Sequence, residues 1–107
     1  MAKFMIFYRS SATAGEQMAA GDPAAAQEAM ALWGKWMEKT GPKLADVGAP
    51  IDERKVVGAG KGEHIGGYSV LEADSADEVE KLVDDHPHFH SPDANILVCE
   101  VLPLPGM

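Results

Sequence analysis

Apolar residues along this chain follow two kinds of spacing, and each kind predicts its own elements. Residues 3–9 and 95–102 are short runs dense in aliphatic and aromatic side chains, which predicts strands that are apolar on both faces. Shorter runs over residues 54–59 and 68–74 predict two further strands. Glycines gather over residues 58–67, so we expect a wide and mobile hairpin between those two strands.

A longer stretch has helical spacing. Asp22 provides an N-cap carboxylate and Pro23 suits the first helical position, where its missing N–H costs nothing. Apolar residues then recur at spacings of four, three and four, at Ala26, Met30, Trp33 and Met37. This predicts an amphipathic helix of about five turns, interrupted at residues 41–42 and followed by one more turn over residues 43–47. The Gly/Ala/Ser-rich residues 10–21 before it predict a mobile connection with one helical turn.

A second helix is expected after the strand over residues 68–74. Ser75 and Glu78 form a capping-box pattern, in which each side chain caps the backbone N–H of the other residue. The apolar face of this helix is marked by Val79, Leu82, Val83 and His86. Pro87 disfavours helical geometry at the residue before it, so we expect the helix to end at His86.

The predicted elements define a fold class. Their order, strand-helix-strand-strand-helix-strand, is that of a ferredoxin-like βαββαβ domain over residues 1–107, an α+β fold with a four-stranded antiparallel sheet and both helices on one face. Because the first and last strands are apolar on both faces, the sheet face without helices needs cover. We expect that cover to be a second sheet, so that two copies form a homodimer in the manner of a dimeric α+β barrel.

Charge and cysteine content narrow the class of partner and the compartment. Nine Lys+Arg against seventeen Asp+Glu give a formal net charge of -8, which disfavours binding to nucleic acid and to anionic membranes. No run of about 18 apolar residues is present, so we expect no membrane span. Cys99 is the only cysteine, which excludes an internal disulfide and favours a reducing, cytoplasmic location. The glycines form no dinucleotide fingerprint, and we expect no bound cofactor.

Histidines dominate the candidate chemistry, because His86, His88 and His90 fall on alternate residues. In an extended segment these imidazoles, with Asp85 or Asp93, would approach a zinc-like ligand set. The helix pattern instead assigns His86 to the apolar face of a helix end, where its cationic form would be favoured. It leaves the other two histidines on a solvated loop. Metal binding is therefore the third hypothesis, behind two that need a single histidine.

Proton transfer requires one histidine that titrates near neutrality in a cleft. The strand ends and helix ends at one edge of the predicted sheet would bring Arg9 and Tyr68 near His86 or His88, and these four residues are the candidate catalytic set. An apolar pocket between the first helix and the sheet is expected to be lined by Tyr8, Trp33 and Trp36. The competing interpretation is that the tryptophans are core, that Tyr68 is a half-buried strand aromatic and that Arg9 faces solvent.

A family resemblance rests mainly on the second half of the chain. Residues 66–89, GGYSVLEADSADEVEKLVDDHPHF, and residues 99–107, CEVLPLPGM, resemble YCII-related proteins, and the first strand with the tryptophan-bearing helix resembles the first half of that family. The resemblance implies a ferredoxin-like subunit paired as a dimeric α+β barrel. It also implies a suspected catalytic pair, namely a histidine early in the first helix and an aspartate before the proline that follows the second. Residues 24–27 contain no histidine, and His86 precedes Pro87, so this pair is missing here.

Three functions follow as hypotheses. The first is a small-molecule enzyme that uses histidine-centred acid/base chemistry in the pocket between the first helix and the sheet. The alternative is a non-catalytic ligand-binding or accessory module in which the histidines only shape that pocket, and the missing family pair favours it. The third is a metal-binding protein. Whether the chain is an enzyme is left open, and the sequence names no substrate.

Overall fold

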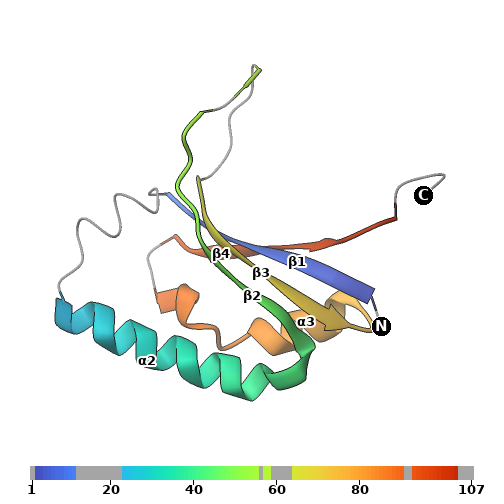
Figure 1. Ribbon diagram of the computed structural model, residues 1–107, viewed down its shortest axis with the longest axis horizontal. Coiled ribbons are helices and arrows are strands. Elements are labelled where there is room, and N and C mark those ends of the chain that lie inside the picture. The colour runs from blue at the N-terminus through green and yellow to red at the C-terminus, as the bar shows by residue number, and fades with distance from the viewer. Residues whose placement is uncertain (1, 12–22, 56, 59–63, 91–92, 104–107) are drawn as a thin grey trace.

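The computed structural model describes residues 2–11, 23–55, 57–58, 64–90 and 93–103. Its helices and strands are β1 (Ala2–Ser10), α2 (Pro23–Thr40), β2 (Leu44–Pro50), β3 (His64–Ala73), α3 (Ala76–Val83) and β4 (Asn95–Glu100), with short 3-10 helices at Gly41–Lys43 and Pro87–His90. Both helices lie on one side of the sheet (Figure 1). The strand order is β2-β3-β1-β4, and every neighbouring pair is antiparallel. The predicted α+β fold with a four-stranded antiparallel sheet is therefore confirmed.

Strand alternation divides the sheet into a helix-covered face and an open face. Along β1, Phe4, Ile6 and Tyr8 are buried, and directly opposed residues of β3 and β4 share their face. The core forms where these residues meet the helices, through Trp36 of α2 and Val79 of α3. Each fully buried aliphatic or aromatic side chain contributes roughly 1.5–3 kcal/mol to folding.

The open face consists of the residues of opposite parity on the same three strands. Phe7 lies opposite Tyr68, and Met5 lies opposite Val70 and Cys99. Neither helix covers this face (Figure 1). We define the open face as Met5, Phe7, Tyr68, Val70, Leu97 and Cys99, all of which retain partial exposure to solvent.

The prediction for the second strand was wrong. The strand is Leu44–Pro50, where one more helical turn was expected over residues 43–47, and Arg54 and Lys55 lie in an irregular segment beyond it. Two register irregularities interrupt its pairing with β3, so its side chains do not show a period of two. Gly48 has a φ of +75°, and a Cβ there would lie 1.7 Å from the carbonyl oxygen of Tyr68. The position of this strand is therefore set by the close approach of its backbone to that of β3, and not by an alternation of apolar side chains.

The second helix begins as predicted and ends earlier. The Oγ of Ser75 accepts a hydrogen bond from the backbone N–H of Glu78 at 3.2 Å, which confirms half of the capping box. The Glu78 carboxylate accepts from the N–H of Asp74 at 3.0 Å instead of that of Ser75. The helix ends at Val83, so His86 lies beyond it rather than on its last turn. Its backbone N–H still bonds to the carbonyl of Val83 at 3.1 Å, which continues the chain into the 3-10 helix.

The remaining boundaries differ by a few residues. β3 begins at His64, so this histidine belongs to a strand and not to the hairpin, and its ring pairs with Glu53. β4 ends at Glu100, two residues earlier than expected. The helical turn expected within residues 10–21 and residues 59–63 of the glycine-rich segment lie outside the described residues. Among the described helices, none has the length and apolar content required to span a membrane.

Candidate functional site

A cavity of about 380 Å³ opens between α2 and the β2 side of the sheet. It lies where the sequence predicts a pocket between the first helix and the sheet. We call it the α2 pocket. Its lining residues are Tyr8, Ser10, Met30, Trp33, Met37, the β2 residues Val47, Gly48, Ala49 and Pro50, Gly66 and His88. Most of this lining is apolar or aromatic, and His88 is its one histidine.

Tyr8 forms the floor of the α2 pocket and is fixed by a chain of hydrogen bonds. Its hydroxyl lies 2.7 Å from the Oγ of Ser69, which itself donates to the carbonyl of Val47 at 2.7 Å. Since serine has one hydroxyl hydrogen, Tyr8 is the donor in the first bond. Burial raises the pKa of Tyr8 to about 12, and the bond to Ser69 opposes this only in part. Tyr8 therefore stays protonated at neutral pH.

His86 lies in an aromatic box behind the pocket. Its ring centroid is 4.8 Å from that of Tyr8, 4.4 Å from that of Trp33 and 4.3 Å from that of Trp36. Only 1% of its surface is exposed. Its Nδ1 accepts a hydrogen bond from the backbone N–H of His88 at 3.0 Å, so Nε2 carries the hydrogen of the neutral ring and has no partner in the described residues.

The ionisation of His86 corrects a prediction. Burial, helped by the neighbouring His88, lowers the pKa of His86 from 6.5 to about 3, while Asp85 acts weakly in the other direction. A helix C-terminus favours the cation by only about 0.3–2 kcal/mol, whereas each pKa unit corresponds to about 1.4 kcal/mol. Desolvation therefore wins, and the ring is neutral at pH 7. The carboxylate of Asp85 is engaged elsewhere, at 2.7 Å from the Nζ of Lys39.

His88 is half-buried at the edge of the pocket, not solvated as the sequence suggested. Its Nε2 lies 2.9 Å from the carbonyl oxygen of Arg9 and 3.1 Å from that of Asn95. Carbonyl oxygens only accept hydrogen bonds, so Nε2 is the protonated nitrogen. The other nitrogen, Nδ1, is then the one able to accept a proton. His88 is thus the pocket residue best equipped for acid/base chemistry.

The expected catalytic set does not come together as a whole. Tyr68 lies opposite Phe7 on the open face, whereas the histidines lie on the helix-covered side, because strand parity separates them. The side chain of Arg9 donates from Nε to the Oδ1 of Asn95 at 2.8 Å, so the arginine meets His88 only through its carbonyl.

The three histidines also do not form a ligand cluster. His90 is exposed, while His86 is enclosed by rings and donates no lone pair outward. Within the described ranges no group of three or more His, Cys, Asp or Glu side chains is placed to hold a metal ion. The geometry of this part of the chain therefore does not support the metal hypothesis.

The two tryptophans separate into different roles. Trp33 lines the α2 pocket and meets Tyr8 edge to face, with ring centroids 5.0 Å apart. Trp36 is 3% exposed, does not line the pocket and donates from Nε1 to the carbonyl of Leu82 at 2.9 Å. It ties α2 to α3 as a core residue.

Several residues of the α2 pocket were not predicted from the sequence. Met30 and Met37 were placed on the helix stripe but not in a pocket, and the β2 residues were missed because that strand was misplaced. Ser69 carried a usable signal, since it is a polar residue at the buried parity of β3. Such a residue needs a hydrogen-bond partner inside the fold, and its partner is Tyr8.

The fold and pocket define an α+β protein with a ferredoxin-like sheet and a small cavity under its first helix. Among solved structures, the chain is similar to 5-chloro-2-hydroxyhydroquinone dehydrochlorinase from Burkholderia phenoliruptrix AC1100, in a complex with 2,5-dihydroxybenzoquinone. The two chains are 25% identical with a TM-score of 0.51, and the match covers 90% of this chain and 89% of that one.

The sequence comparisons add no family. No protein-family model matches the chain, and no curated protein matches it. The resemblance to YCII-related proteins therefore stays a prediction. What the structural neighbour supports is a small-molecule enzyme or binder on this fold.

Proposed function

We propose that the chain binds a small organic molecule in the α2 pocket and that His88 exchanges a proton with it. The observation that carries this proposal is the placement of one histidine, with a defined tautomer, at the edge of an apolar and aromatic cavity of about 380 Å³. A volume of this order suits a small organic ligand. The dehydrochlorinase with a similar fold holds a dihydroxybenzoquinone, which supports a small oxygenated ring as the ligand class.

The lining suits a planar ring. Trp33 and Tyr8 offer rigid aromatic surfaces at a large angle to each other, 77° between ring planes. Met30 is 70% exposed at the pocket mouth, and Met37 lies further in, so two flexible thioether side chains adapt to the outline of the ligand. An apolar ring would gain about 25 cal/mol for each Å² of surface that it buries here.

Proton transfer would use the free nitrogen of His88. When a ligand oxygen that is ionised in solution binds, Nδ1 takes up a proton from the solvent, and the imidazolium ring then donates this proton to the ligand oxygen. The carbonyls of Arg9 and Asn95 already accept from Nε2–H, and this bond strengthens when the ring becomes cationic. His86 acts as a positioning residue, because its Nδ1 holds the backbone N–H of His88. Tyr68 has no part in this site.

The test compares His88→Gln with the matched control His90→Gln, which makes the same change at an exposed position of the same 3-10 helix. The probe is 2,5-dihydroxybenzoquinone, and calorimetry in buffers of different ionisation enthalpy measures the protons taken up on binding. We expect His88→Gln to abolish the proton uptake and His90→Gln to leave it unchanged. Equal uptake in parent and His88→Gln would refute the role of His88. If millimolar probe leaves the NMR signals of Trp33 and Tyr8 unchanged, the ligand class is wrong.

A non-catalytic binding module is the second candidate. No carboxylate among the described residues bonds to His88, and both Tyr8 and His86 are held neutral, so the site has few groups to complete a reaction. The distinguishing measurement is turnover of the bound probe, followed by its absorbance over hours. Binding with proton uptake but no chemical change would favour the module.

We also propose that two copies pair through their open faces as a homodimer, as the sequence predicts. Support comes from the apolar composition of that face and from the absence of any helix over it in the described chain (Figure 1). Val70→Asp is expected to convert a dimer into a monomer in light scattering, while Val57→Asp, at an 89% exposed position, is not. A parent chain that is monomeric at 100 µM would contradict this pairing. We also propose that residues 1–107 form a single YCII-related domain and that the protein is located in the cytoplasm.

A further inference from the structure

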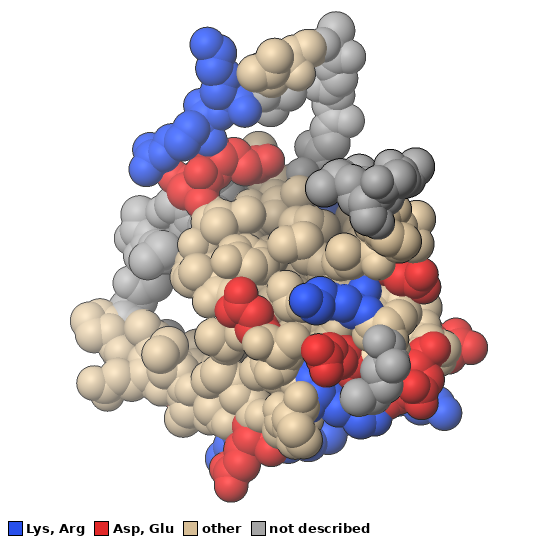
Figure 2. Space-filling view, turned by 45° about the vertical axis from the view of Figure 1, so that its right-hand side comes forward, with Lys and Arg blue, Asp and Glu red and all other residues tan. Residues whose placement is uncertain are grey.

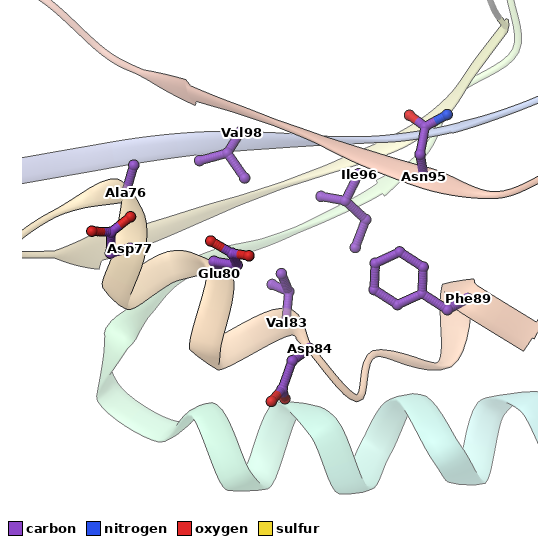
Figure 3. A pocket seen from close by; sticks show the side chains of 9 residues that line it. All are labelled: Ala76, Asp77, Glu80, Val83, Asp84, Phe89, Asn95, Ile96 and Val98. Atoms are coloured by element: carbon purple, nitrogen blue, oxygen red, sulfur yellow. The ribbon is translucent and has the colours of Figure 1, made fainter.

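A second and larger cavity lies on the same face of the sheet as the α2 pocket, between α3 and β4. It has a volume of about 620 Å³ and contains no histidine. We call it the α3 groove (Figure 3). Its lining residues are Ala76, Asp77, Glu80, Val83, Asp84, Phe89, Asn95, Ile96 and Val98. None of these residues lines the α2 pocket, so the groove is a separate feature.

The floor of the groove is apolar. Ile96 and Val98 project from β4 towards α3, where Val83 and Phe89 face them in Figure 3. Phe89 is 43% exposed, which is unusual for an aromatic side chain of this size. Covering these side chains would remove apolar surface from water and stabilise a complex.

The rim of the groove is acidic. Glu80 extends towards β4 and Asp77 lies at the N-terminal end of α3, whereas Asp84 is turned away from β4 in the view of Figure 3. Glu100 shares its strand face with Ile96 and Val98, because side chains alternate along β4. In the described part of the chain, no basic side chain forms an ion pair with Asp77, Glu80 or Glu100. The rim therefore carries carboxylates that no ion pair with a described residue neutralises, although Lys81 lies next to Glu80 on α3.

Among the described strands, none pairs with the edge of the sheet above the groove. β4 is the last strand in the order β2-β3-β1-β4. The N–H of Val101 bonds to the carbonyl of Lys3 at 2.9 Å, which continues the register in which Phe4 lies opposite Glu100. In an antiparallel ladder the bonded positions alternate, so Asn95, Leu97 and Cys99 bond to β1. The backbone groups of Ile96, Val98 and Glu100 then point outward from the sheet.

These three observations point to one kind of occupant. We propose that the α3 groove binds an extended segment of another protein, in which the residues of one parity, those that face α3, include both apolar and basic side chains. Its backbone pairs with the outward N–H and C=O groups of Ile96, Val98 and Glu100, as in other cases of strand addition to an exposed sheet edge. Its apolar side chains cover Val83 and Phe89, and its lysines or arginines meet the acidic rim.

A second copy of this chain fits the groove poorly. Edge-to-edge pairing of two β4 strands is isologous, so it would bring the two acidic rims together. The chain carries a net charge of -8 at pH 7, which adds to this repulsion. A basic partner would instead be attracted both by the acidic rim and by the net negative charge of the chain. The homodimer proposed above pairs the open faces, whereas the α3 groove lies on the helix-covered face.

The probe is the capped peptide Val-Thr-Lys-Thr-Val-Thr-Lys, whose valines and lysines share one face of a strand, titrated into the full chain and followed by the amide signals of Ile96, Val98 and Glu100. We call it the lysine-valine peptide. The same peptide with glutamate in place of each lysine tests charge, and the lysine-valine peptide with every backbone nitrogen methylated tests strand pairing. We expect the lysine-valine peptide to bind at least tenfold more tightly than either control peptide. Its affinity should fall as salt is raised, because the rim charges are exposed.

Matched variants of the chain show which residues bind the peptide. Glu80→Gln should lower the affinity for the lysine-valine peptide by about two- to fivefold, which is the range of an exposed ion pair. Glu38→Gln on α2 should leave this affinity unchanged. Asp77→Asn repeats the test if Glu80→Gln does not fold. Equal affinity for the lysine and glutamate peptides, shifts confined to residues outside the groove, or no shift at millimolar peptide would overturn the proposal. So would amides of β4 that are already protected in a concentration-dependent manner, since a second copy would then occupy the edge.

Discussion

The α2 pocket and the α3 groove lie under the same sheet, yet they differ in almost every property. The pocket is aromatic, and its Tyr8 hydroxyl is bonded and protonated, with burial raising the pKa to about 12. The groove has an apolar floor, and among the described residues its rim carboxylates form no ion pair and the strand edge that it borders is unpaired. The first suits a small oxygenated ring and the second a cationic chain. One fold thus offers two recognition chemistries on one face.

The short 3-10 helix Pro87–His90 separates the two sites. Adjacent residues of this helix serve opposite sides, since His88 lines the α2 pocket and Phe89 lines the α3 groove. The buried ring of His86 holds this helix in place, because its Nδ1 accepts a hydrogen bond from the backbone N–H of His88. The difference between the sites therefore depends on a neutral histidine.

Charges of both signs are mixed on the face that Figure 2 shows. In this view, lysine and arginine side chains are interspersed with aspartate and glutamate around a broad uncharged area. No continuous basic patch is visible among the described residues on that side.

The largest expected effect is the loss of stability in acid that His86 causes. Its pKa is about 3 in the folded chain and near 6.5 when unfolded, so the unfolded chain binds more protons between these values. Stability from the neutral ring is complete above about pH 6.5 and falls by about 1.4 kcal/mol per pH unit down to pH 3. Urea unfolding at pH 4, 5, 6 and 7 should show this slope in the parent and a flatter one in His86→Leu.

His90→Gln is the control for this measurement. Carboxylates such as those of Asp85 and Glu78, whose pKa values are lowered by Lys39 and Lys43, add their own acid dependence to every variant. Only the difference between parent and variant reports on His86. An equally steep slope in His86→Leu would show that the ring is not buried in its neutral form.

The second-largest expected effect is that of Gly48→Ala, which should disrupt the α2 pocket and leave the α3 groove intact. A Cβ at this position would lie 1.7 Å from the carbonyl oxygen of Tyr68, and its φ of +75° disfavours any side chain. Gly48→Ala should therefore displace β2 and lower the free energy of unfolding by about 3 kcal/mol. Because β2 lines only the α2 pocket, binding of 2,5-dihydroxybenzoquinone should be lost while the lysine-valine peptide still binds the α3 groove.

Gly58→Ala is the matched control. Gly58 also has a positive φ, +97°, but nothing lies within 4 Å of a Cβ there. Its substitution should cost about 1 kcal/mol and leave both ligands bound. Loss of both binding activities in Gly48→Ala would mean that the two sites are coupled, which contradicts their separation by the 3-10 helix.

The sequence predicted those parts of the fold that side-chain patterns determine. The first helix, the strands β1, β3 and β4, the start of α3 and the antiparallel sheet all followed from apolar spacing and caps. β2 did not, because its pairing depends on backbone approach at Gly48 and on irregular register, neither of which leaves a periodic signal. A strand of this kind is visible only once its partner is in place.

The site was predictable in outline only. The pocket position, Tyr8, Trp33 and His88 followed from topology, since they lie on elements that the pattern had placed. The ionisation of His86 could not be predicted, because it depends on three rings that enclose it from different elements. The face of the sheet on which Tyr68 lies depends on strand register, because a shift of one residue moves a side chain from the helix-covered face to the open face.

The smallest expected effect is a gain in stability that should leave both sites unchanged. Gly34 lies within α2, and nothing is found within 4 Å of a Cβ added there. Alanine would restrict the unfolded chain and favour the helix, so Gly34→Ala should raise the free energy of unfolding by about 0.5–1 kcal/mol. The exposed Ala31→Gly in the same helix should lower it by a similar amount. A loss of stability in Gly34→Ala would show that another surface packs against this part of α2, so that the helix, unlike the free edge of β4, is already covered.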